Sequence, residues 1–154
     1  MDGLQVFWYL RYSRLKIKCF WGEKIMSSRI LYVDDDPESC QMLKEMLAYA
    51  DGGYHVAIAN SAEQALELID DAPFDLYLVD YMLPEMDGLT LCRTIRDRGL
   101  KEPIIVFTAL VRPDDKKHVL AAGADEYLVK PNDLQLVPQT VRRLLNQNSA
   151  HTAN

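Results

Sequence analysis

A chain of 154 residues, 49% of them hydrophobic, is long enough to form one ordinary domain with a buried core. Its formal net charge of −6 argues against a nucleic-acid or anionic-membrane surface, since both require a basic patch. No apolar run approaches the ~20 residues of a membrane span, and the odd number of widely spaced cysteines, Cys19, Cys40 and Cys92, favours reduced thiols in a cytoplasmic protein.

The first 27 residues differ in composition from the rest of the chain. They hold both tryptophans and an excess of basic side chains, at Arg11, Arg14, Lys16, Lys18 and Lys24. A secretory signal would place its charges before an apolar stretch and end at a small-residue cleavage site, and neither feature is present. This extension is expected to be disordered or non-native. Three interpretations stay open: an interfacial basic-aromatic anchor, a docking arm, or sequence translated upstream of a true start at Met26.

From Arg29 onward the chain alternates strand-like and helix-like patterns. Five β-rich runs predict strands: "RILYV" (29–33), "YHVAIA" (54–59), "FDLYLV" (74–79), "PIIVF" (103–107) and "DEYLV" (125–129). A helical pattern follows each strand, over about 37–50, 62–69, 89–99, 113–122 and 134–145. Asp36 and Ser61 are typical N-caps of the first two helices, and Pro37 suits the first helical position. The polar segment 147–154 is expected to be a flexible tail, which leaves the domain at 28–146 with no room for a second domain after it.

Alternation of five strands with five helices predicts an α/β fold with a parallel sheet covered on both faces. In such sheets, sites form beyond the carboxyl ends of the strands. Polar residues stand directly at four of these ends: Asp34 with Asp35, Asp80, Thr108 and Lys130. Each alone has a structural explanation, such as a helix cap or a solvated lysine, but together they predict one site.

The residue types at these strand ends point to phosphoryl chemistry. Asp34, Asp35 and Asp80 offer hard oxygen ligands, which favour Mg²⁺ completed by waters and phosphate oxygens. Asp80 can attack a phosphoryl group as a carboxylate nucleophile and form an acyl phosphate. Thr108 can donate a hydrogen bond to a phosphoryl oxygen, and Lys130 can pair with another.

The chain contains four motifs: "YVDDDP", "VDYMLPEMDG", "FTA" and "YLVKP". They occur in the order and spacing of the receiver domain of bacterial two-component response regulators, and residues 29–146 resemble that family. The resemblance implies a flavodoxin-like, doubly wound, five-stranded sheet in the order 2-1-3-4-5. Asn132 departs from the family, in which phenylalanine is common at that position.

The resemblance also assigns roles to individual residues. It implies that Asp80 is the phosphoacceptor and that Asp34 and Asp35 hold Mg²⁺ together with Asp80 and the backbone carbonyl of Met82. It implies that Thr108 and Lys130 contact the phosphate, that Tyr127 changes rotamer upon phosphorylation, and that the Lys130–Pro131 peptide bond is cis, which X-Pro chemistry permits.

By this resemblance the chain is expected to be a stand-alone, chemotaxis-type receiver, with no enzymatic activity beyond its own phosphotransfer and dephosphorylation. The expected phosphodonor is a sensor histidine kinase or a histidine phosphotransfer protein. Phosphorylation is expected to switch a face formed by the fourth helix, fifth strand and fifth helix, across 113–122 and 137–145, where a downstream protein binds. No nucleic-acid partner is expected, and a membrane partner is disfavoured.

Two rival functions remain as alternatives. A receiver-shaped docking module would bind its partner without phosphorylation. A phosphohydrolase of the haloacid dehalogenase type would use Asp34 and Asp36 in its opening motif, although Glu38 stands where that motif has Thr or Val. A flavin site is disfavoured, because the first loop offers aspartates where a flavin phosphate needs N–H and hydroxyl donors.

Overall fold

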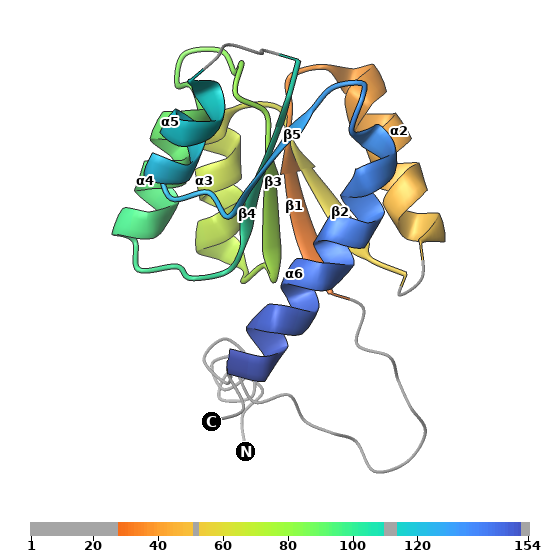
Figure 1. Ribbon diagram of the computed structural model, residues 1–154. Coiled ribbons are helices and arrows are strands. Elements are labelled where there is room, and N and C mark those ends of the chain that lie inside the picture. Colours follow the sequence, from red (N-terminus) through yellow and green to blue (C-terminus); the bar gives the residue numbers. More distant parts are fainter. Residues whose placement is uncertain (1–27, 51–52, 110–113, 152–154) are drawn as a thin grey trace, which may run out of the picture.

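The computed structural model describes residues 28–50, 53–109 and 114–151, in which strands and helices alternate (Figure 1). The strands are β1 (Arg29–Val33), β2 (His55–Ala59), β3 (Leu76–Val79), β4 (Ile104–Thr108) and β5 (Glu126–Val129). The helices are α2 (Pro37–Tyr49), α3 (Ala62–Asp71), α4 (Gly88–Asp97), α5 (Asp115–Ala121) and α6 (Val137–His151), and the 3₁₀ turn η1 (Leu134–Leu136) precedes α6. The N-terminal extension, residues 1–27, lies outside the described residues.

The five strands form one parallel sheet in the order β2-β1-β3-β4-β5. The strand order and the α/β class predicted from the sequence are therefore confirmed. All neighbouring strands are parallel, but the direction in which successive strands are added to the sheet reverses between β1 and β3. Loops at this switch form the crevice in which such sheets carry their sites.

Helices cover both faces of the sheet, with α2 and α6 on one side and α3, α4 and α5 on the other (Figure 1). Each face holds its own buried cluster, because successive strand residues point to opposite faces. One cluster joins β-strand residues such as Tyr32, Leu78 and Phe107 to α2 and α6. The other joins residues such as Val33 and Val106 to α3, α4 and α5.

Cys40 and Cys92 are buried free thiols, one in each of these clusters. Burial raises the pKa of Cys40 to about 11 and that of Cys92 to about 12. Both residues therefore behave as small core side chains, as their helical neighbours predicted.

The helix caps follow the predicted chemistry. Asp36 accepts hydrogen bonds from the N–H groups of Glu38 and Ser39, and its bond with Ser39 is the main reason that its pKa is lowered. Ser61 caps α3 by accepting from the N–H of Gln64. Because both carboxylate oxygens of Asp36 are engaged at the start of α2, this residue serves the helix, which disfavours the dehalogenase-type motif.

The structure corrects the end of the last helix. The sequence placed this end near Asn146 because the residues that follow are polar, whereas α6 continues to His151. Within the added turn, the hydroxyl of Ser149 donates to the carbonyl of Leu145, 2.9 Å away. Polar residues on the exposed side of a helix do not interrupt it. The helix end predicted near Asn146 is therefore wrong, and 152–154 lie outside the described residues.

The start of the fifth predicted helical region also differs from the prediction. Leu134 to Leu136 form a 3₁₀ turn, and the α-helix begins only at Val137. The helix predicted for 113–122 begins at Asp115, and Pro113 lies outside the described residues.

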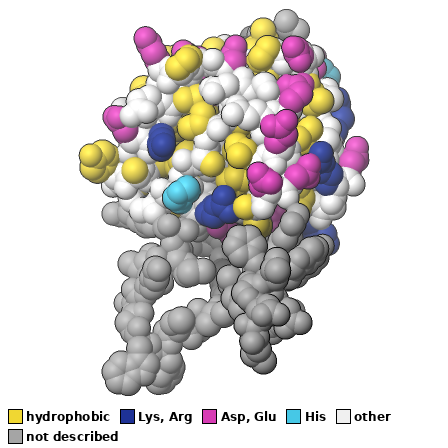
Figure 2. All heavy atoms as spheres, turned by 180° about the vertical axis from the view of Figure 1, so that it is seen from behind, with side chains coloured by type: hydrophobic (Ala, Val, Ile, Leu, Met, Phe, Trp, Pro, Cys, Tyr) yellow, Lys and Arg dark blue, Asp and Glu magenta, His cyan; other side chains and the backbone are white. Residues whose placement is uncertain are grey.

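Among the described residues, none of the helices combines the length and the apolar character that crossing a membrane requires. Figure 2 shows the molecule from behind, where acidic side chains gather on one part of the surface and the Lys and Arg side chains of the described residues are scattered.

Candidate functional site

The four predicted polar strand ends meet at one edge of the sheet. Asp34 follows β1, Asp80 follows β3, Thr108 ends β4 and Lys130 follows β5. Backbone hydrogen bonds continue the sheet to these residues: the N–H of Asp80 donates to Val33 O over 2.8 Å, and that of Lys130 donates to Thr108 O over 2.9 Å. The carboxyl ends of neighbouring parallel strands thus bring together residues that lie far apart in sequence.

The ammonium group of Lys130 bridges the two acids of neighbouring strands. Its Nζ lies 2.8 Å from Asp80 Oδ2 and also donates a hydrogen bond to Asp34 Oδ2. Burial alone would lower the pKa of Lys130, but the hydrogen bonds to Asp34 and Asp80 outweigh burial and raise it. Lys130 therefore carries its positive charge throughout the physiological pH range.

Two buried carboxylates share this single ammonium group. Asp34 is 1% exposed and Asp80 is 8% exposed, so water screens them poorly. One positive charge neutralises the two acids only in part. The site therefore keeps a net negative charge, which favours a further positive group.

Backbone groups fix the orientation of both carboxylates. Asp34 Oδ1 accepts from the N–H of Asp36 over 2.9 Å, and Asp80 Oδ1 accepts from the N–H of Met82 over 3.1 Å. The loop after β3 is tightly folded, because the N–H of Gly88 donates to Tyr81 O over 2.9 Å. The backbone N–H of Met82 thus lies against the carboxylate of Asp80.

Two aromatic rings flank the lysine, and the sequence reasoning missed both. Lys130 Nζ lies 5.9 Å from the centroid of the Tyr32 ring and 5.4 Å from that of Phe107. The hydroxyl of Tyr32 also donates a hydrogen bond to Asp34 Oδ2. A period-2 count along β1 could have found Tyr32, because it stands two residues before Asp34 and shares its face of the sheet.

The remaining predicted residues occupy distinct places around this cluster. Asp35 is exposed at the end of β1, and Thr108 is 1% exposed at the end of β4. Tyr127 is partly buried on β5, and burial raises its pKa. Because Val106 pairs with Tyr127 and Thr108 stands two residues after Val106, Thr108 and Tyr127 share one face of the sheet. The Lys130–Pro131 peptide bond, expected to be cis, is cis.

The donor set fits Mg²⁺. Among the described residues, no three Asp, Glu, His or Cys side chains converge as a ready metal cage. Mg²⁺ does not need such a cage, because it takes one or two carboxylates, keeps several waters and accepts phosphate oxygens. Asp34 and Asp80 supply buried carboxylate oxygens from two strands, and Asp35 adds an exposed one beside them.

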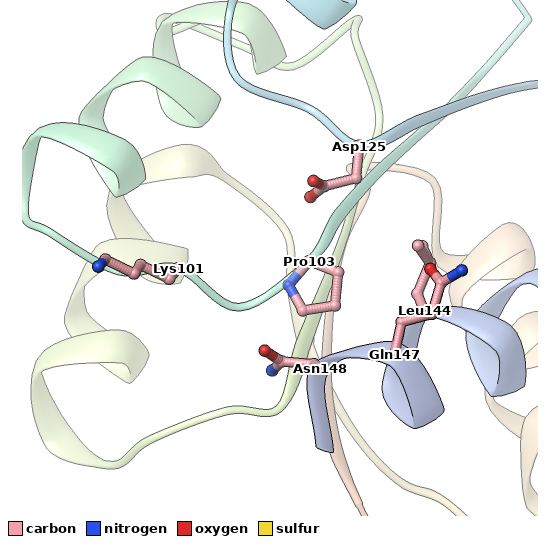
Figure 3. Close-up of a pocket in the computed structure, with 6 residues that line it drawn as sticks. All are labelled: Lys101, Pro103, Asp125, Leu144, Gln147 and Asn148. Atoms are coloured by element: carbon pink, nitrogen blue, oxygen red, sulfur yellow. The ribbon is translucent and has the colours of Figure 1, made fainter. Parts of the chain in front are cut away.

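A separate pocket of about 150 Å³ lies at the opposite edge of the sheet (Figure 3). Lys101 and Pro103 line it just before β4, Asp125 lines it just before β5, and Leu144, Gln147 and Asn148 of α6 close its other side. These strand positions are amino ends, whereas Asp80 and Lys130 follow carboxyl ends. The pocket is therefore not part of the acidic site.

Comparison with known sequences places the chain in a family. The sequence model of the response regulator receiver domain matches residues 30–142. The response regulator MprA of Mycobacterium bovis (strain BCG / Pasteur 1173P2) is 38% identical over 128 residues, which are 83% of this chain and 55% of the relative. MprA of Mycobacterium ulcerans is 39% identical over 122 residues, 79% of this chain and 52% of that protein. The chain spans about half the length of these curated relatives.

Solved structures give the same result. A CheY-like response regulator receiver domain protein of Methanospirillum hungatei has a TM-score of 0.75 and 30% identity, over 81% of this chain and 98% of that one. The chemotaxis protein CheY4 of Vibrio cholerae has a TM-score of 0.70 and 31% identity, over 77% of this chain and 98% of that one. With the acidic strand ends and the bridging lysine in place, the chain belongs to the response regulator receiver domain family.

Proposed function

We propose that Asp80 accepts a phosphoryl group from a phosphohistidine, carried by a sensor histidine kinase or a histidine phosphotransfer protein. The observation that carries this proposal is the ammonium group of Lys130, held between the carboxylates of Asp34 and Asp80. A lysine so placed can pair with an oxygen of a phosphoryl group that arrives at Asp80. Members of this family are signalling modules, and the proposed chemistry serves signalling.

In the transfer, a carboxylate oxygen of Asp80 attacks phosphorus. A new P–O bond forms, the P–N bond to the donor histidine breaks, and its electron pair returns to the imidazole nitrogen. The N–H of Met82 and the ammonium of Lys130 orient the attacking carboxylate before the reaction. After the transfer, the ammonium group of Lys130 would pair with an oxygen of the phosphoryl group on Asp80.

Asp34, Asp35, Asp80 and the backbone carbonyl of Met82 would hold Mg²⁺, which when bound supplies the positive charge that the two buried carboxylates and the phosphoryl oxygens require. Backbone groups of the chain orient the carboxylates of this site. Hydrogen bonds from the backbone of Asp36 and Met82 hold the buried carboxylates in fixed orientations.

Signal output would follow from the position of Thr108. A phosphoryl group on Asp80 offers acceptor oxygens to the Thr108 hydroxyl at the neighbouring strand end. A shift of Thr108 toward them changes the space next to Tyr127, which shares its face of the sheet. The equilibrium between two arrangements of α5, β5 and α6 would shift with it, and a downstream protein would bind this face in a cytoplasmic setting.

The direct test is incubation of the protein with acetyl phosphate and MgCl₂, followed by intact-mass spectrometry. The expected product carries one phosphoryl group that is lost in acid and on treatment with hydroxylamine, as an acyl phosphate is. Asp80→Asn should abolish the labelling, whereas Asp36→Asn, a change to a helix cap, should retain it. Labelling that survives Asp80→Asn would refute the assignment of the phosphoacceptor.

A further inference from the structure

The two oxygens of Asp34 have different partners, and all of these partners lie in the described part of the chain. Oδ1 accepts one hydrogen bond, from the N–H of Asp36 over 2.9 Å. Oδ2 accepts two, from the ammonium of Lys130 and from the hydroxyl of Tyr32. A carboxylate oxygen offers about two lone pairs, so Oδ2 is filled and Oδ1 keeps room for one more contact.

Tyr32 is rigidly placed to donate this bond. It lies in β1, paired with Ile58 of β2 on one side and Leu78 of β3 on the other, and its side chain is 0% exposed. A carboxylate oxygen accepts and a phenol O–H donates, so the Tyr32 hydroxyl is the donor of this bond. Because Tyr32 is fully buried, its hydroxyl donates to Asp34 and not to bulk water.

The bond decides how the Asp34 carboxylate is turned. The buried hydroxyl of Tyr32 donates to Oδ2 of Asp34. If the Asp34 carboxylate turned about its Cβ–Cγ bond, this hydroxyl would lose its acceptor, and an unsatisfied buried donor costs free energy. Oδ1 is thereby kept as the oxygen that is available to an arriving cation. The transfer of a phosphoryl group to Asp80 does not itself use the Tyr32 hydroxyl, and Asp34 also accepts hydrogen bonds from Asp36 and Lys130. The role of the Tyr32 hydroxyl is therefore confined to the orientation of Asp34.

We propose that Tyr32 is a positioning residue of the acidic site, whose hydroxyl fixes Asp34 for Mg²⁺ through a hydrogen bond and whose ring supports the ammonium of Lys130. This proposal rests on the proposed function. Groups that hydrogen-bond to a metal-binding carboxylate typically change metal affinity by about 10- to 100-fold when they are removed. The hydroxyl of Tyr32 is such a group.

The test compares Tyr32→Phe, which removes only the hydroxyl, with Tyr77→Phe, which removes the hydroxyl of a second fully buried tyrosine on β3. Tyr77 packs in the other cluster, against α3, α4 and α5, away from Lys130. Binding of MgCl₂ without a phosphodonor is measured by isothermal titration calorimetry. Tyr32→Phe should weaken binding by about tenfold, and Tyr77→Phe should leave it unchanged.

A second measurement separates positioning from a general loss of structure. In acetyl phosphate reactions, Tyr32→Phe should raise the half-saturating MgCl₂ concentration by about the same factor, while the maximal rate at saturating MgCl₂ stays close to that of the wild type. In an Asp34→Ala background, Tyr32→Phe should cause no further change, because the acceptor of its hydrogen bond is gone. If Tyr32→Phe does not fold, the same measurement is made on Tyr32→Ile, because isoleucine is β-branched and suits a strand.

The outcomes are distinct. If the wild type is phosphorylated but Tyr32→Phe binds MgCl₂ as well as the wild type, the role of Tyr32 is refuted and the proposed function stands. An equal loss with and without Asp34 also refutes it, because Tyr32 would then act elsewhere. If the wild type neither binds MgCl₂ nor accepts a phosphoryl group, the proposed function fails first, and the role of Tyr32 fails with it.

Discussion

Replacing Lys130 with methionine tests the central ion cluster. Methionine keeps the length and apolar character of the side chain but leaves the carboxylates of Asp34 and Asp80 buried without their cation. At 2.8 Å and an effective dielectric constant near 20, the attraction between Lys130 and Asp80 is about 6 kcal/mol before the cost of desolvation is subtracted. Removing one partner of a buried ion pair typically costs 3–5 kcal/mol.

We expect the lower end of this range, because the Lys130 side chain is 16% exposed and water can partly replace it. The free energy of unfolding should fall by about 3 kcal/mol, and the melting temperature by roughly 10 °C, in urea and thermal unfolding followed by circular dichroism without divalent cations. The matched control is Lys116→Met, which removes an exposed lysine of α5 and should change stability by less than about 0.5 kcal/mol.

A double variant decides whether the loss is electrostatic. Asp80→Asn in the Lys130→Met background removes one of the two unpaired charges, so it should recover about 1 kcal/mol or more. If Lys130→Met is as stable as the wild type, or if Asp80→Asn recovers nothing in that background, the argument that the lysine compensates two buried carboxylates is refuted.

The remaining predictions concern pH and two backbone contacts. The pKa of Lys130 is raised in the folded protein, so its contribution to the free energy of unfolding is complete below the ordinary lysine pKa and is lost as pH rises through the folded value. Above about pH 10.5, stability should therefore fall more steeply in the wild type than in Lys130→Met. Urea unfolding at several pH values measures this difference. Gly88→Ala should lower the free energy of unfolding by about 3 kcal/mol, because a Cβ at Gly88 would lie 2.1 Å from the carbonyl oxygen of Asp80. Gly99→Ala should cost less, because a Cβ there meets no atom within 4 Å and the penalty is only the strain of an alanine at φ +76°. Equal losses in thermal unfolding would contradict this. Arg96→Met should lower the free energy of unfolding by about 3 kcal/mol in the same assay, because Arg96 donates to three backbone carbonyls and a carboxylate at the start of β4 and β5. The control is Arg98→Met, which removes an ion pair on the surface. Equal losses in the two variants would contradict the prediction.

The sequence pattern alone was sufficient for the order of elements and for a parallel sheet, whereas the strand order was implied by the resemblance to the receiver family. Apolar runs of period 2 and helical runs of period 3.6 are local properties, and their alternation allows only a parallel sheet with helices on both faces. The same local pattern marks where each strand ends. It therefore placed Asp34, Asp80, Thr108 and Lys130 at one edge of the sheet before any side-chain geometry was available.

Local pattern misjudged features that depend on packing. The polarity of residues after Asn146 predicted the end of the last helix there, but α6 continues because a helix tolerates polar residues on its exposed side. The strand pattern over 29–33 includes Tyr32 and gave no sign that its hydroxyl contacts Asp34.

What the chain determined by itself is which residues stand at the strand ends, because that follows from the succession of apolar and polar residues along each segment. Only the tertiary structure decided which of their atoms meet. Lys130 reaches Asp34 across 96 positions and Asp80 across 50, and both contacts depend on the register of four strands and on the rotamer of one long side chain. Strand register and rotamers result from the packing of both sheet faces at once, and no single segment of sequence contains that information.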